Sequence, residues 1–378
     1  MLATAAGLTA AILAGSSWYF AEKIRSEALV VEPGPAMRAY DDARFAGLSA
    51  GQAQMIAIGD QPALSKPALY GVAWPGGVGH LGASVAVSDG GITRPLTVTS
   101  GLAPRAGQPA ALERAYFLGD VETALGIPVE NVVVPGPAGP LPAWHFPGRS
   151  RTFVICVHGQ NGTRKDVLRI VDVVHHMGFP ALAVTYRNDL GVAPDPSGYL
   201  RHGQTEWRDI EAAVQWSLAH GARRIVLAGQ SMGGGVVAAF LKHSPLAPAV
   251  ARVVLDAPML DLHAAVGYQV ARHCTPAIGR LLAPVVWTAE RIASLRFGID
   301  WSATAYLDEI AWLNVPVLIT HGDDDTRVPV SISAALAELR PSLATLAVFP
   351  GAGHLESWNI DRARYTSLVE SFLAPVAA

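Results

Sequence analysis

The segment Gly229–Gly233, with the sequence Gly-Gln-Ser-Met-Gly, constrains this chain more than any other. An apolar run, residues 225–228, precedes it, and a segment rich in small and apolar residues, 234–241, follows it. This order predicts a strand, a sharp turn and a helix, with the Ser231 hydroxyl exposed above a sheet. Both flanking positions must be very small, because a side chain there would collide with neighbouring backbone in so tight a turn. We predict that Ser231 is a nucleophile; the alternative is a Gly-rich connection that carries an unreactive serine.

Segments of strand length alternate with helical segments from residue 132 onwards. A hairpin is expected at 132–146, further strands at 152–157, 181–186, 224–228, 253–255, 315–320 and 346–349, and helices at 167–177, 206–220 and 365–373. A continuous apolar run such as Thr152–Val157 is typical of a strand that is buried on both faces. The alternation predicts an α/β fold, with a mostly parallel sheet between two layers of helices. Ligands of such sheets bind beyond the carboxyl ends of the strands.

A long stretch without strand signals, residues 261–313, lies between two of these strands. Helical patterns occupy 266–272, 278–287 and 290–295. The carboxyl ends of the flanking strands should face the site, so we interpret the stretch as a helical lid over it. The alternative is a set of ordinary packing helices.

Residues 1–21 carry no charged side chain and end in aromatic residues. About 20 apolar residues can cross a bilayer as a helix, and aromatic residues are enriched at the interface. The segment therefore predicts a membrane anchor, a transmembrane helix that makes the protein membrane-associated; a signal peptide and a buried helix are the alternatives. The basic residues Lys23, Arg25 and Arg38 follow it, which weakly places the body in the cytoplasm.

Residues 22–131 form an N-terminal extension in which strand-like pieces are separated by turns rich in Gly and Pro. A helix is predicted at 41–55. We assign no chemistry to this extension, and we interpret its His80 as structural.

The composition excludes several classes of protein. Hydrophobic residues make up 51% of the 378 residues and the net charge is -3, so a substantial core is expected. No basic stripe with interleaved aromatic residues is present, which makes nucleic acid an unexpected partner. Cys156 and Cys274 lie far apart and are not spaced as metal ligands. We expect no cofactor and no metal.

A serine hydroxyl needs a base, usually a histidine that a carboxylate orients. After this kind of strand-to-helix turn the expected order is serine, then acid, then histidine. His321 and His354 both follow predicted strands, but only His354 has the aspartates 323–325 between it and Ser231. His354 is therefore the predicted base, and His321 is a structural residue. The residues alone do not separate the three aspartates, which could also form a cation-binding loop.

Three segments together resemble the α/β-hydrolase family: Gly229–Gly233, His321–Pro329 and Gly353-His354. In many members the loop that carries the acid has the sequence His-Gly-x-x-Asp-x-x-Val-Pro, so the resemblance implies that Asp325 is the acid. In parts of the family an acid at an earlier strand end takes this role, which makes Asp256 the alternative.

A tetrahedral intermediate also needs backbone N–H donors at its developing negative charge. One donor is expected at Met232, directly after the nucleophile. The loop after the strand at 152–157 resembles the family's His-Gly-x loop, which implies Gln160 as the second donor, with Asn161 as the alternative. His158 is interpreted as a residue that fixes this loop.

The predicted division is therefore a membrane anchor (1–21), an extension (22–131) and an α/β-hydrolase domain (132–378) with a lid insertion at about 261–313. The resemblance covers only the last of these. It implies a serine hydrolase that cleaves a carboxylic ester of a small acyl substrate through an acyl-enzyme, with a lipid-like substrate as one option. Serine peptidase, thioesterase and acyltransferase activities are the enzymatic alternatives. A non-catalytic, membrane-tethered binding protein is the alternative from another class.

Overall fold

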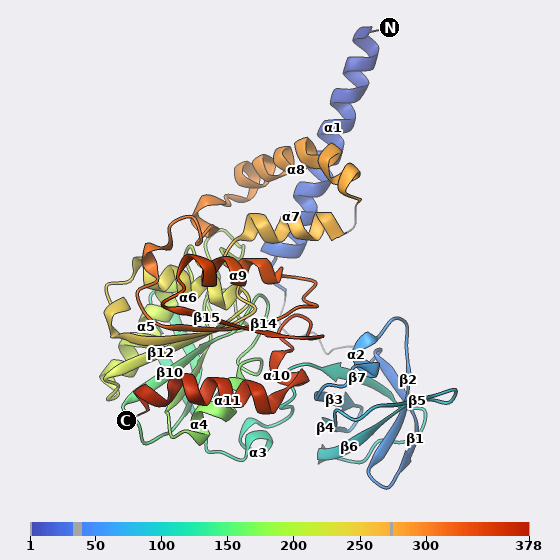
Figure 1. Cartoon of the computed structure of the whole chain (residues 1–378), viewed down its shortest axis with the longest axis vertical. Helices are drawn as coiled ribbons and strands as arrows, with labels where there is room; N and C mark the ends of the chain where they lie inside the picture. The colour runs from blue at the N-terminus through green and yellow to red at the C-terminus, as the bar shows by residue number, and fades with distance from the viewer. Residues whose placement is uncertain (1, 33–39, 273–274, 378) are drawn as a thin grey trace.

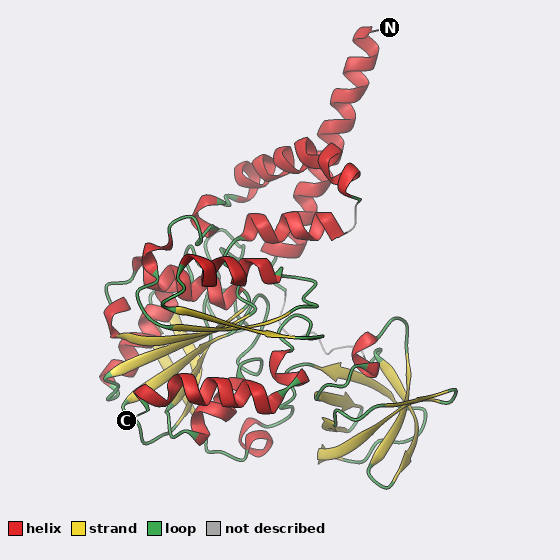
Figure 2. Cartoon of the chain, viewed as in Figure 1, coloured by secondary structure: helices red, strands yellow, loops and turns green. Residues whose placement is uncertain are grey.

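The larger of two sheets forms the centre of the computed structural model, which describes residues 2–32, 40–272 and 275–377 (Figures 1 and 2). Its strand order is β15-β14-β13-β12-β10-β11-β9-β8. The strands are β8 (Glu130–Gly136), β9 (Gly139–Phe146), β10 (Thr152–Val157), β11 (Ala181–Val184), β12 (Arg224–Gln230), β13 (Val250–Asp256), β14 (Val317–Gly322) and β15 (Ala344–Phe349). The strands from β10 to β15 pair in parallel, whereas the β8–β9 hairpin is antiparallel at one edge.

Helices cover both faces of this sheet (Figure 1). One face packs on α4 (Leu168–His176) and α11 (Arg362–Leu373), and the other packs on α5 (Trp207–Ala219), α6 (Met232–His243) and α9 (Val330–Leu339). Side chains of β10 alternate between the two cores: Phe153 and Ile155 face one, and Val154 and Cys156 face the other. The predicted α/β architecture is confirmed.

A smaller antiparallel sheet precedes the larger one. It contains β1 (Ala43–Ser49), β2 (Gln52–Ala57), β3 (Tyr70–Trp74), β4 (Gly77–Leu81), β5 (Ala86–Ser88), β6 (Gly91–Gly101) and β7 (Pro109–Glu113), with the short helix α2 (Pro62–Ser65). The order β2-β1-β7-β3-β4-β6 returns to β2 through a β2–β6 pairing, so this sheet, here called the closed sheet, closes on itself. Its interior holds its own apolar core around Phe45, Met55 and Trp74.

The helix predicted at residues 41–55 is wrong, because β1 and β2 form a hairpin there. The positive φ angles of Ala50 and Gly51, 44° and 78°, place both residues in the left-handed region that a tight two-residue hairpin turn requires. Buried residues recur at every second position on each side of the turn, which is the period of a strand.

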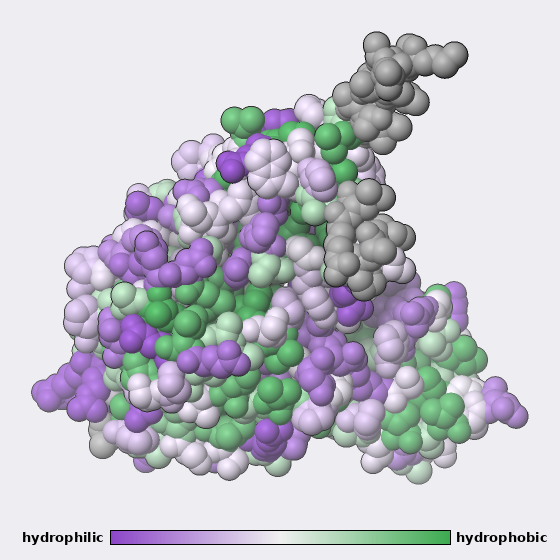
Figure 3. Space-filling view, turned by 45° about the horizontal axis from the view of Figure 1, so that its top comes forward, coloured by the Kyte–Doolittle hydropathy of each residue, from purple (hydrophilic) through white to green (hydrophobic). Residues whose placement is uncertain are grey.

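After β7 the chain joins the larger core. Phe117, Val121 of α3 (Val121–Leu125) and Ile127 pack in the same apolar cluster as α4 and α11. On the face drawn in Figure 3, hydrophobic side chains form patches over both sheets, with hydrophilic side chains between them. Exposed apolar residues of the closed sheet include Ile56 and Val87.

Two helices, α7 (Leu262–Arg272) and α8 (Pro276–Phe297), occupy most of the segment between β13 and β14. The patterns at 278–287 and 290–295 belong to one continuous helix rather than to two. Short 3-10 turns at Ser302–Thr304 and Ile310–Trp312 complete the segment.

The predicted membrane anchor at residues 1–21 is wrong, and so is the membrane-associated location inferred from it. Within residues 2–32, 40–272 and 275–377, no helix combines the length and the apolar character needed to span a bilayer. The segment folds as the helix α1 (Leu2–Ile24). Its last turns instead pack on α8, where Ala21 is buried together with Ala289 and Ala293 (Figure 1).

Candidate active site

Ser231 lies between β12 and α6, with φ 51° and ψ -119°. This backbone conformation is sparsely populated for a residue with a side chain, and it persists only where the surroundings fix it. Its N–H donates to the Asp256 carbonyl, and its carbonyl accepts from the N–H groups of Gly234 and Met259, each at 2.9 Å. These bonds hold the strained residue at the carboxyl end of β12.

The glycines of this turn are required by close approach to neighbouring backbone. A Cβ atom added to Gly233 would lie 2.4 Å from the Val157 carbonyl oxygen, and one added to Gly229 would lie 2.7 Å from the Gly233 carbonyl oxygen. A Cβ atom on Gly159 would come within 3.1 Å of the Ser231 Cβ. The loop after β10 is therefore packed directly against Ser231.

Replacing Gly233 by alanine should lower the free energy of unfolding by roughly 3 kcal/mol, because the new methyl group meets backbone that cannot rotate away. Urea denaturation would measure the change. Gly267→Ala in α7 is the matched control, since its Cβ meets nothing within 4 Å and should be neutral or slightly stabilising. Equal unfolding midpoints for both variants would contradict the steric argument.

Side chains from three strand ends form one continuous series of hydrogen bonds. The Ser231 Oγ lies 3.0 Å from His354 Nε2, and His354 Nδ1 lies 2.7 Å from Asp325 Oδ2. Asp325 follows β14 and His354 follows β15, so the parallel sheet brings residues 123 positions apart into contact. The structure thus brings together the three predicted residues.

Asp325 lies among hydrogen-bond donors. Its Oδ1 accepts the N–H groups of Arg327 and Val328 at 2.7 and 2.9 Å, and His321 Nε2 lies 3.2 Å from its Oδ2. Burial alone would raise the pKa of Asp325, but the hydrogen bonds from His321 and His354 outweigh it and hold the pKa well below its ordinary value. Asp325 is therefore an ionised acceptor.

The alternative acids are placed differently. Asp323 and Asp324 are exposed, unlike the buried Asp325. Asp256 is buried, but its carboxylate accepts the hydroxyl of Thr320 at 3.1 Å and that of Ser357 at 3.4 Å. Burial raises the pKa of Asp256. Among the hydrogen bonds of the described residues, His354 is paired with Asp325 rather than with Asp256.

Comparison with known proteins agrees with this fold. Residues 148–296 match the Hydrolase_4 family, described as serine aminopeptidase, S33. An esterase of Pyrococcus furiosus has a similar structure, with a TM-score of 0.54 and 18% identity, over 69% of this chain and 96% of that chain. The chain has the α/β-hydrolase fold. In this fold the nucleophile, the acid and the histidine follow one another along the chain in the order found here.

Two further proteins match in sequence over part of the chain. An uncharacterized protein of Mycobacterium tuberculosis is 26% identical to this chain over 243 residues, which are 63% of this chain and 76% of that protein. A non-heme haloperoxidase of Rhodococcus erythropolis is 43% identical over 54 residues, 14% of this chain and 20% of that protein.

The loop after β10 is fixed by a buried cluster. His158 Nε2 lies 2.8 Å from the Asp189 carboxylate, and its Nδ1 lies 3.0 Å from the Gly159 carbonyl oxygen. The Tyr186 hydroxyl donates to the His158 carbonyl at 2.9 Å, and the two rings stack. These side chains fasten the loop, so they are not free to line a pocket.

A segment from near the N-terminus crosses the same loop. The backbone of residues 27–32, here called the strap, accepts the side-chain amide of Gln160 at 2.7 Å and that of Asn161 at 3.1 Å. His202 also contacts the strap, with its Nε2 2.7 Å from the Ala28 carbonyl oxygen. Burial lowers the pKa of His202 to about 4, so the neutral ring donates this bond. The strap therefore clamps the loop that carries the predicted donor Gln160.

The helical insertion contacts the acid loop. The Tyr268 hydroxyl donates to the Asp325 carbonyl at 2.9 Å, and the Gln269 amide donates to the Arg327 carbonyl at 2.9 Å. Helix α7 is therefore attached directly beside the carboxylate that faces His354.

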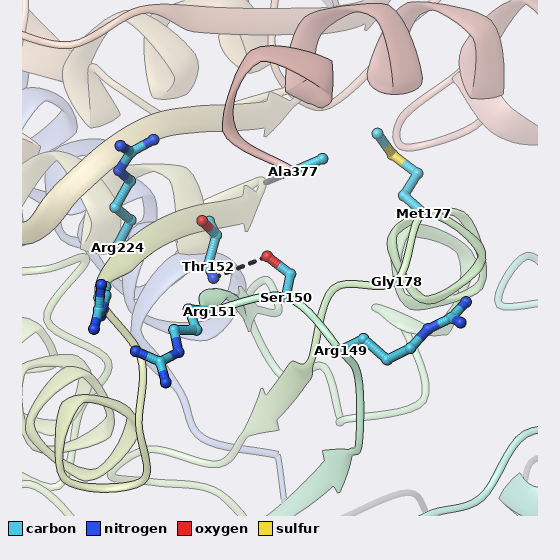
Figure 4. Close-up of a pocket in the computed structure, with 9 residues that line it drawn as sticks. Arg149, Ser150, Arg151, Thr152, Met177, Gly178, Arg224 and Ala377 are labelled. Carbon is cyan, nitrogen blue, oxygen red and sulfur yellow. Dashed lines mark hydrogen bonds between the residues drawn. The ribbon is translucent and has the colours of Figure 1, made fainter.

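A surface cavity of about 510 Å³ lies at the other end of the strands from Ser231, by the amino ends of β10 and β12 (Figure 4). Four arginines contribute to its lining, Arg149, Arg151, Arg223 and Arg224. The three labelled in Figure 4, Arg149, Arg151 and Arg224, point away from one another, so their guanidinium groups do not converge. This cavity is separate from the site around Ser231.

Proposed function

We propose that this α/β hydrolase is a serine hydrolase that cleaves a carboxylic ester of a small acyl substrate. The hydrogen-bonded series from Ser231 through His354 to Asp325 is the observation that supports the proposal most directly. It provides a nucleophile within reach of a base, and a base oriented by an ionised carboxylate.

In the proposed reaction the Ser231 oxygen attacks the acyl carbonyl while His354 Nε2 takes the hydroxyl proton. Asp325 keeps His354 in the required tautomer and stabilises the imidazolium that forms. The backbone N–H groups of Met232 and Gln160 stabilise the oxyanion. His354 then protonates the leaving alcohol, and water attacks the acyl-enzyme to release the acid.

We propose an ester as the bond that is cleaved because the similar solved structure is an esterase. The family match is described as a serine aminopeptidase, which makes a peptidase the first alternative. Peptidase, thioesterase and acyltransferase activities use the same groups. We further propose that α7 and α8 act as the lid, because α7 is bonded to the Asp325 loop.

Covalent labelling tests the proposal without knowledge of the natural substrate. A fluorophosphonate should modify the wild-type protein, and mass spectrometry should locate the adduct on Ser231. Nitrophenyl esters of increasing acyl length should then be hydrolysed faster than thioesters and aminoacyl anilides. Faster cleavage of the anilides would indicate a peptidase, and no labelling at all would favour the non-catalytic binding protein.

The pH dependence should show an acid limb below pH 6.5, the ordinary pKa of histidine. Burial lowers the pKa of His354; the Asp325 carboxylate opposes this, and the cations Arg114 and Arg327 add to it. The neutral ring is the active base, so activity is lost only when the pH falls through this lowered value. A profile of kcat/KM against pH would measure it, and a limb above 6.5 would contradict the assignment.

A further inference from the structure

The backbone next to His354 is strained. Leu355 has a φ of 59°, which is rare for a residue with a side chain and persists only when surrounding contacts fix it. From the side of the larger sheet, the buried guanidinium of Arg169 in α4 donates to the Leu355 carbonyl at 2.7 Å and to the side chain of Asn359. These contacts hold one side of the loop that follows β15 and carries His354.

The closed sheet holds the other side through the carboxylate of Glu356. Its Oε2 accepts the N–H of Gly353 at 2.9 Å and the ammonium group of Lys66 at 2.7 Å. Its Oε1 accepts the hydroxyl of Tyr70 at 2.7 Å. Because Gly353 directly precedes His354, Glu356 links the closed sheet to the backbone that carries the proposed base.

This cluster is shielded from solvent. The side chains of Lys66 and Glu356 are 20% and 13% exposed, and Tyr70 is 2% exposed. Burial would raise the pKa of Glu356, but the hydrogen bonds from Lys66 and Tyr70 outweigh it and lower the pKa. The carboxylate is therefore ionised, and charge-assisted hydrogen bonds of this kind are stronger than neutral ones.

Further contacts dock the closed sheet on α10 (Ser357–Ile360). Leu69 and Asn359 exchange two hydrogen bonds: the Leu69 N–H donates to the Asn359 carbonyl at 2.8 Å, and the Asn359 amide donates to the Leu69 carbonyl at 2.6 Å. The rings of Tyr116 and Trp358 lie 5.0 Å apart. The position of Glu356 is thus fixed by an interface and not by one ion pair alone.

We propose that Lys66 and Tyr70, acting through Glu356, are positioning residues for His354, so that the closed sheet is part of the working active site. The inference rests on the proposed function, because the step it affects is proton transfer from Ser231. His354 Nε2 must stay within hydrogen-bond reach of the serine, and a misplacement of about 1 Å can cost roughly 100-fold in rate.

Glu356→Gln is the central variant. It keeps the shape of the side chain but leaves an amide nitrogen facing either the Lys66 ammonium or the Tyr70 hydroxyl. We expect kcat for a nitrophenyl ester, and the rate of fluorophosphonate labelling, to fall about 10- to 100-fold while KM changes by less than about threefold. Tyr70→Phe removes one hydroxyl and should lower both rates by a smaller factor. A Glu356→Gln variant with wild-type rates would overturn the inference.

The pairing between Lys66 and Glu356 supplies a second readout. Lys66→Met should lower kcat in the wild-type background but add little to Glu356→Gln, because residues that act through one contact are not additive. Lys66→Arg, which keeps the charge, should retain most of the activity. A Lys66→Met effect of equal size in both backgrounds would also overturn the inference.

Glu309→Gln is the matched control. It breaks a Lys–Glu pair of the same 2.7 Å length, with Lys242, on the exposed surface away from His354. It should keep wild-type rates. Thermal unfolding would confirm that the variants are folded, and Tyr70→Phe carries the test should Glu356→Gln unfold. Absence of labelling in the wild-type protein would overturn the proposed function, whereas wild-type labelling with unchanged Glu356→Gln and Tyr70→Phe rates overturns this inference alone.

Discussion

Replacing Ser231 by alanine should lower kcat for ester hydrolysis by about 10⁶-fold and abolish fluorophosphonate labelling. The substitution removes the hydroxyl oxygen, which is the only atom of that side chain that can attack a carbonyl. No covalent intermediate can therefore form. Alanine is also the smallest change available at a position with φ 51°. The fold and any binding of substrate should therefore survive, which separates loss of chemistry from loss of structure.

Ser150→Ala is a suitable control, because Ser150 lines the cavity at the amino ends of the strands (Figure 4). Its replacement should not affect turnover. His354→Ala should lose nearly as much activity as Ser231→Ala, and the double variant little more, since the three residues act as a unit. Labelling that persists in Ser231→Ala would show that another residue is the nucleophile.

The turn at Gly229–Gly233 was predictable because its signal is local. The strand, the tight turn and the helix follow one another directly in the sequence, and the glycines are explained by contacts within the turn and with the loop after β10. The order of serine, acid and histidine then selected His354 over His321. In the structure His321 contacts Asp325, the Ser333 hydroxyl and the Val328 carbonyl, and it is His354 that lies 3.0 Å from the Ser231 Oγ.

The role of Asp325 was harder to predict from the sequence. Three consecutive aspartates have the same chemistry, and only their burial and partners in the fold distinguish them. The family pattern, rather than physical reasoning from the residues, selected the third.

The closed sheet could not be derived from local patterns. Its closure depends on β2 pairing with β6 and on β1 pairing with β7, contacts between strands that are separated by several others. The Lys66–Glu356 contact joins residues 290 positions apart, so no spacing rule could suggest it. For residues 1–21, the uncharged composition predicts a membrane-spanning helix, but no helix of the described residues combines the length and the apolar character that this requires.

Replacing Asp325 by asparagine should lower kcat/KM for a nitrophenyl ester by about 10⁴-fold. The asparagine amide can donate to His354 Nδ1 and so favour the tautomer whose Nε2 carries the proton, which cannot accept another from Ser231. It also removes the negative charge that stabilises the imidazolium. The labelling rate should fall in parallel, because the same proton transfer activates the serine towards the probe.

The neighbouring aspartates make this prediction specific. Asp323→Asn and Asp324→Asn change the same chemical group at exposed positions and should stay within about threefold of wild type, as surface substitutions usually do. Asp256→Asn should have a far smaller effect than Asp325→Asn, because the hydrogen bonds of Asp256 go to Thr320 and Ser357. If Asp256→Asn abolished turnover while Asp325→Asn left it near wild type, the acid would lie at the end of β13, and the short Asp325–His354 contact would have to be structural.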